Sequence, residues 1–135
     1  MARTPRTRPV TVAQVRAYLA KAEEYVLAAR AELDAERTIA ATSLAIHAAI
    51  NAADAVTGTR LGQRSAGQDH GEVLLLLRQA GSDGTELAKD LRRLLPLKTR
   101  AEYDPDAIPR AMASKAVERA HRCSAIARRV IASQP

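Results

Sequence analysis

Alanine dominates this sequence, and aromatic residues are almost absent. The chain of 135 residues contains 29 alanines and three tyrosines, with no phenylalanine and no tryptophan. A β-sandwich core needs β-branched and aromatic side chains, whereas alanine, leucine, isoleucine and valine fill the narrow space between closely packed helices. The composition therefore predicts an all-α protein, and the length is sufficient for one domain with a single core.

Apolar residues recur at three- and four-residue steps over most of the chain, as in amphipathic helices. Thr11 is a good N-cap for the first helix, and glycines and prolines mark the expected breaks. Helices are expected over residues 11–37, 38–56, 69–80 and 105–132, with a loop over 58–67. A further helix, the fourth in chain order, is expected to begin at residue 85 and to end somewhere in 96–103. The second helix is apolar nearly all round, which is typical of the middle of a bundle. Short connections predict an antiparallel bundle of four to five helices.

The first ten residues differ from the rest in composition. They contain three arginines and two prolines, which disfavour a helix and predict a basic disordered arm over residues 1–10. Residues 11–135 then form the single helical-bundle domain.

Charge and cysteine content limit the kinds of partner and compartment. The net charge is +6, and 17 of the 21 basic residues are arginines, whose planar fork suits phosphate, although GC-rich coding produces the same bias. The single cysteine, Cys123, excludes an internal disulfide and a cysteine-rich zinc site, so no metal or cofactor is expected. The longest apolar run, 73–77, is too short to cross a membrane, and the first residues lack a signal peptide. We expect a cytoplasmic protein without a membrane partner.

Four polar residues interrupt the second predicted helix, and they share one face. Ser43, His47, Asn51 and Asp54 lie four, four and three residues apart, within a stripe about 80° wide. Burying such side chains is costly unless they are paired. The stripe has two interpretations of equal weight: a hydrogen-bond network that fixes helix register, or the lining of a cleft in which Asp54 orients a base or an arginine.

Two further groups combine cations with groups capable of acid–base or phosphate chemistry. Arg64 and His70 lie at the mouth of the third predicted helix, where backbone N–H groups favour an anion, although His70 as a capping or turn residue is the simpler interpretation. Lys98, Arg100 and Tyr103 lie near the end of the fourth helix, within reach of a shared groove. Alternatively, Tyr103 closes the aromatic-poor core and the cations satisfy helix C-terminal carbonyls.

Three basic residues on the last predicted helix form a third group. Arg110, His121 and Arg128 fall within about 20° of one another. One hypothesis is that they face the same cleft as His47.

These segments together resemble the HEPN superfamily, small helical-bundle proteins of prokaryotic toxin–antitoxin and defence systems. The resemblance covers residues 11–132 and is carried by SLAIHAAINAAD at 43–54, DHGE at 69–72 and LLPLKTRAEY at 94–103. It implies a bundle that often forms a homodimer, a cognate antitoxin or partner protein and, in the catalytic members, a metal-independent ribonuclease with an Arg and a His four to six residues later. Here Lys98 stands for the basic residue and Glu102 for the His, so the resemblance favours binding over cleavage.

Three functions remain open. The first is binding of RNA or nucleotide phosphate in a polar groove between helices, and its candidate residues are Asn51, Asp54, Lys98, Arg100 and Tyr103. The second is a metal-independent ribonuclease in which His47 or His70 takes the 2′-OH proton and Arg64 stabilises the developing charge. The third is a protein-interaction or oligomerisation bundle without either activity.

Overall fold

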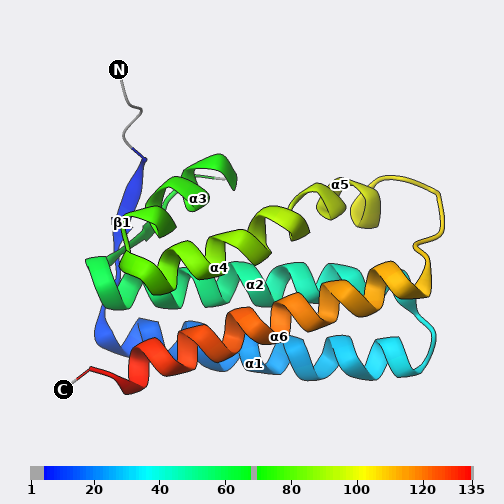
Figure 1. Ribbon diagram of the computed structural model, residues 1–135, viewed down its shortest axis with the longest axis horizontal. Helices are drawn as coiled ribbons and strands as arrows, with labels where there is room; N and C mark the ends of the chain where they lie inside the picture. Colours follow the sequence, from blue (N-terminus) through cyan, green and yellow to red (C-terminus); the bar gives the residue numbers. More distant parts are fainter. Residues whose placement is uncertain (1–4, 68–69, 135) are drawn as a thin grey trace.

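The computed structural model describes residues 5–67 and 70–134 and shows an all-α bundle (Figure 1), as predicted. Four long helices form the body, and two short helices lie beside α2 and α4. The helices are α1 (Val12–Asp34), α2 (Thr38–Leu61), α3 (His70–Arg78), α4 (Gly81–Leu94), α5 (Pro96–Glu102) and α6 (Arg110–Ala132). The predicted fourth helix is thus two helices, because Pro96 cannot continue the backbone hydrogen bonding of α4.

The central element is α2, which packs against α1, α6, α4 and α5. Its buried faces are made mainly of alanines with no exposed surface, and these let the neighbouring helices approach closely. The buried alanines of α2 are Ala41, Ala45, Ala48, Ala49, Ala52, Ala53 and Ala55. By length and composition α2 could span a membrane, but more than half of its most apolar window is buried in the bundle, as in the core helix of a soluble protein.

The first helix begins as the sequence predicts. The Thr11 hydroxyl accepts a hydrogen bond from the Gln14 backbone N–H, and the Gln14 side chain accepts one from the Thr11 N–H. This reciprocal capping box satisfies two backbone donors that the helix itself leaves free.

A short β-ribbon is the main feature that the sequence did not predict. Strand β1 (Thr7–Pro9) pairs antiparallel with β2 (Gln63–Ser65), and the ribbon continues through a hydrogen bond from the Val10 N–H to the Gly62 carbonyl. The expectation of a disordered arm is therefore wrong for residues 7–9, while residues 1–4 lie outside the described part of the chain. The buried Glu72 side chain of α3 also pairs with Arg6, which ties the arm to the body.

Two glycines expected to break helices lie inside them instead. Gly58 is buried within α2, where an added Cβ would lie 2.8 Å from a Val15 methyl group. Gly84 lies in α4, where a Cβ would lie 2.1 Å from the Leu77 carbonyl oxygen of α3. In both places close packing requires glycine, and the chain turns at other glycines: Gly62 (φ 68°) after α2, and Gly81 (φ 82°) at the start of α4.

The last helix begins five residues later than predicted, at Arg110. Pro109 precedes it, and a proline disfavours helical geometry in the residue before it. That residue, Ile108, packs into the core with 2% of its surface exposed. The connection from α5 is therefore an extended segment anchored by Ile108.

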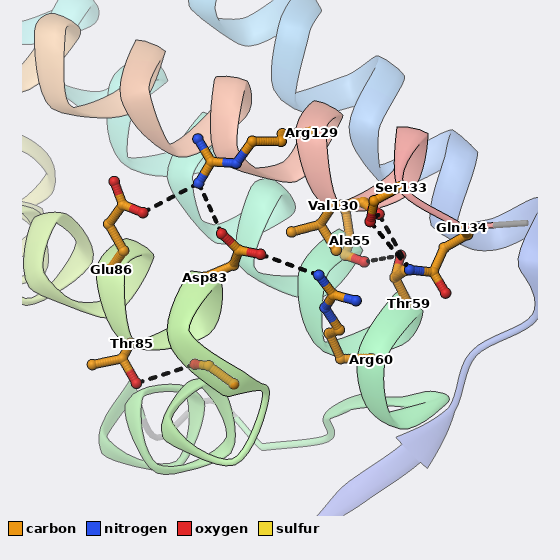
Figure 2. A network of polar contacts seen from close by, with 11 residues as sticks. Ala55, Thr59, Arg60, Asp83, Thr85, Glu86, Arg129, Val130, Ser133 and Gln134 are labelled. Atoms are coloured by element: carbon orange, nitrogen blue, oxygen red, sulfur yellow. Dashed lines mark hydrogen bonds and ion pairs between the residues drawn. The ribbon is translucent and has the colours of Figure 1, made fainter.

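Ion pairs connect α4 to α6 and to the end of α2. Asp83 accepts hydrogen bonds from Arg60 of α2 at 3.1 Å and from Arg129 of α6 at 2.8 Å, and Arg129 also reaches Glu86 (Figure 2). The two arginines lower the pKa of the Asp83 carboxyl below its usual value. Two turns further along α4, the buried Asp90 binds two more arginines of α6, Arg119 and Arg122. The acidic residues of α4 thus all face other helices.

The close approach of α3 and α4 at Gly84 gives a first prediction. Gly84→Ala should lower the free energy of unfolding by about 1–3 kcal/mol, because the added methyl group forces α4 away from the Leu77 carbonyl. At an exposed helical position the same Gly→Ala change raises the free energy of unfolding by about 1 kcal/mol. The sign of the change in the free energy of unfolding therefore distinguishes a packed position from an exposed one. Urea denaturation measures the difference, with Ser82→Ala, at an exposed position of the same turn, as control. A stabilised Gly84→Ala protein would contradict the packing described here.

Candidate functional site

The polar stripe predicted on α2 lies along the part of this helix that other elements cover least. Ser43, His47, Asn51 and Asp54 are all half-buried, whereas the alanines on the other sides of α2 are fully enclosed. The recorded side-chain hydrogen bond of the stripe runs within the helix, from Asn51 Nδ2 to the His47 carbonyl oxygen at 2.8 Å. In the described residues no hydrogen bond joins one stripe side chain to another, so the interpretation as a register-fixing network is not supported.

An aromatic contact connects the stripe to α1. The His47 ring stacks on the Tyr25 ring with 5.6 Å between centroids and 30° between planes. The Lys21 ammonium group lies 6.0 Å from the Tyr25 ring centroid, at the limit of a cation–π interaction. Two cationic or protonatable groups therefore gather around one of only three tyrosines in the chain.

Asp54 is the most perturbed carboxyl of the site. Burial raises its pKa to about 7, while the positive charges of Arg64 and Lys21 oppose that shift. No side chain in residues 5–67 and 70–134 hydrogen-bonds its carboxyl. Asp54 is therefore present in both protonation states near neutral pH, and it is within electrostatic range of a cation from α1 and a cation from β2.

The β-ribbon supplies the second cation in an unusual way. Arg64 of β2 lies directly opposite Arg8 of β1 in the ribbon register, and like charges in that position repel each other. Arg64 is half-buried and donates a hydrogen bond to the Ser65 carbonyl oxygen at 3.0 Å. Sequence analysis could not find this pair, because the two residues are far apart in the chain and neither strand was predicted.

These residues define one surface, which we name the α1–α2–β2 face. It consists of Lys21 and Tyr25 of α1, His47 and Asp54 of α2, and Arg64 of β2. Its chemistry combines two cations with a carboxyl that titrates near neutral pH and an imidazole held on an aromatic ring. Such a set can bind an anion and exchange protons with it.

The predicted residues of α5 do not join this face through an ion pair or hydrogen bond within the described chain, whereas Asn51 donates to the His47 carbonyl oxygen of the face. On α5, Lys98 and Arg100 are half-buried, and Arg100 donates to the Ala107 carbonyl oxygen at 3.4 Å. Tyr103 is 76% exposed, so the expectation that it closes the core is wrong. His70 is the first residue of α3 and half-buried, while Asp69 beside it lies outside the described residues.

The hypothesis that His121 faces the same cleft as His47 is wrong. His121 lines an open groove of about 600 Å³ between α1 and α6, together with Leu27 and Arg30. Arg110 and Arg128 of the same stripe pair with Glu36 and Glu23. Glu23 and Tyr25 are two residues apart on α1, about 200° around the helix, so the two histidines lie on different sides of α1.

The described residues contain neither a group of metal ligands nor a reactive thiol. Within the described residues, 5–67 and 70–134, no group of three or more His, Cys, Asp and Glu side chains is arranged to hold a metal ion. Burial raises the pKa of the Cys123 thiol, which makes it a poor nucleophile.

Neither a protein-family model nor a curated protein matches this chain.

The raised pKa of Asp54 makes a prediction about stability. Because the folded protein binds this proton more tightly than the unfolded chain, the ionised carboxyl opposes folding above its unfolded pKa, and the cost grows until the pH passes about 7. Asp54→Asn should therefore raise the free energy of unfolding, and by more at about pH 8 than at about pH 5. Urea denaturation at both pH values measures this, with the exposed Asp106→Asn as control. An equal effect at both pH values would place the pKa of Asp54 in its ordinary range.

Proposed function

We propose that this protein is a HEPN-like helical bundle of toxin–antitoxin or defence type that binds RNA or a nucleotide by its phosphate on the α1–α2–β2 face. The observation that carries the proposal is the placement of Lys21 and Arg64 around Asp54, next to the stacked pair of Tyr25 and His47. A cytoplasmic location, a homodimer and a cognate partner protein belong to the same proposal and rest on the family resemblance.

The charges of the face favour a phosphate over other ligands. Arg64 and Lys21 offer a planar fork and a compact ammonium group, the two usual protein donors to phosphate oxygens. The protonated form of Asp54 adds an O–H donor, and an approaching anion stabilises that form further. Arg8, opposite Arg64, loses part of its repulsion when a phosphate lies near the ribbon. The binding residues thus differ from the α5 candidates Lys98, Arg100 and Tyr103.

Binding of a labelled RNA tests the proposal directly. Changing Arg64→Gln or Lys21→Gln should weaken the affinity for a short single-stranded RNA about tenfold each, since each removes one charge-assisted contact of about 1.4 kcal/mol. Fluorescence anisotropy at fixed salt measures the affinity, and Arg16→Gln, an exposed cation elsewhere on α1, is the matched control. Affinity that falls equally in the control, or that is unchanged in both site variants, contradicts binding at this face.

A second candidate function, metal-independent RNA cleavage, is favoured by one specific observation. A carboxyl with a pKa of about 7 is tuned for general acid–base catalysis near neutral pH, and His47 lies on the same stripe of α2. Arg64 would stabilise the charge that develops on the phosphate. Against this candidate, α5 carries Glu102 where the resemblance places a catalytic His, and this residue is exposed.

Incubation of RNA with the purified protein in excess chelator separates the two candidates. We expect the RNA to be bound and to remain intact. Cleavage that disappears in His47→Ala but persists in His121→Ala would instead make the protein a ribonuclease with its base on α2, since His121 lies on the opposite side of α1. His70→Ala tests the remaining imidazole in the same assay.

A further inference from the structure

The acidic residues of α4, Asp83, Glu86 and Asp90, are all engaged by arginines of other helices. From residue 74 to residue 101 the sequence contains no further acidic residue. Arg78, Lys89 and Arg92 of this segment form no ion pair within the described part of the chain.

Three of these basic residues surround one groove between α3 and α4. Arg78 of α3 and Lys89 and Arg92 of α4 line a groove of about 190 Å³, together with Leu74, Thr85 and Ala88. All three cations are exposed, and none forms an ion pair with an acidic residue in the described part of the chain. By contrast, five arginines of α6 are paired: Arg110, Arg119, Arg122, Arg128 and Arg129.

The shape and charge of this groove match a nucleic-acid backbone better than a small enclosed ligand. Its volume is below the range of about 300–1,000 Å³ that is usual for small-molecule pockets. Three cations that share a shallow groove repel each other, and a polyanion relieves that repulsion while releasing its own counterions. The half-buried Leu74 side chain gives the groove an apolar wall against which a ribose or a base can pack.

We propose that the α3–α4 groove is a second RNA contact, which holds the sugar–phosphate backbone of a strand through Arg78, Lys89 and Arg92. This inference rests on the proposed function, because it extends the same ligand to a separate surface. The groove differs in chemistry from the α1–α2–β2 face, because no carboxyl group and no imidazole line it. It should therefore contribute RNA affinity that depends on salt concentration, and not on RNA sequence or on pH near neutrality.

The test compares two triple variants with equal loss of charge. The groove variant is Arg78→Gln, Lys89→Gln and Arg92→Gln, and its matched control is Arg16→Gln, Arg30→Gln and Lys115→Gln, three exposed cations on α1 and α6 without recorded ion pairs. Anisotropy of a fluorescein-labelled single-stranded RNA is measured between about 50 and 200 mM salt, together with the Arg64→Gln protein. Circular dichroism confirms that each variant is folded, as expected for changes at exposed positions.

The expected result is specific to the groove variant. Its affinity should fall tenfold or more at low salt, and the slope of log affinity against log salt should become less steep by about 2, the value for three lost contacts to a single strand. The control triple should change neither quantity by as much. Equal losses in the two triple variants would show a general effect of net charge, and an unchanged groove variant would show that the strand does not reach α3–α4; both outcomes overturn the inference.

Two further outcomes keep this inference apart from the proposed function. If the groove variant loses affinity while Arg64→Gln does not, RNA binds at the groove and the α1–α2–β2 face is not its site. If Arg64→Gln loses affinity while the groove variant does not, the proposed function stands and the groove inference fails.

Discussion

The close packing of helices against the alanines of α2 is the constraint on which the rest of the structure depends. An alanine side chain ends at Cβ, so α1 and α6 approach α2 with little between the backbones, and Gly58 allows the approach to continue to the end of the helix. A core built in this way has few large side chains to bury, and its stability comes from the extent of contact. It also fixes α1 tightly enough for Tyr25 to stack on His47. The geometry of the candidate site follows from the composition of the core.

The candidate site is the place where this sequence departs from what stability alone would select. A carboxyl at position 54, half-buried without a hydrogen-bond partner among the described side chains, opposes folding at neutral pH. The cross-strand neighbours Arg8 and Arg64 repel each other in the short ribbon nearby. The unpaired Asp54 carboxyl and the repulsion between Arg8 and Arg64 both oppose folding, and the anionic ligand proposed above would relieve both. An anion does so, because it attracts the arginines and favours the protonated carboxyl.

The sequence predicts those features that are encoded within a few residues and misses those that depend on distant packing. Helical periodicity and the capping pattern at Thr11 gave the long helices, and the 100° step per residue gave the polar stripe from Ser43 to Asp54. The β-ribbon was missed because its strands are three residues long and far apart in the chain. The local preference of glycine for turns predicts a helix break at Gly84. The contact with the Leu77 carbonyl of α3, which requires glycine there, depends on tertiary packing that the local sequence does not show. His121 was misplaced because helical angles relate residues on one helix only, and the position of α1 between His121 and His47 is a property of the fold.

Net charge is a poor guide to function here, and the structure shows why. Many of the arginines are neutralised by acidic residues on neighbouring helices, so they act as connections within the bundle (Figure 2). The acidic side chains of α4 pair with arginines of α6 and α2, and Lys89 and Arg92 of the same helix line the groove beside α3 without an ion pair in the described part of the chain. The exposed cations without an ion pair in the described residues include Arg16, Arg30 and Lys115, and also Arg78, Lys89 and Arg92, which together line the α3–α4 groove. The pairing of arginines with acidic residues, more than the excess of arginine in the composition, therefore decides which cations remain available to the anionic ligand proposed above.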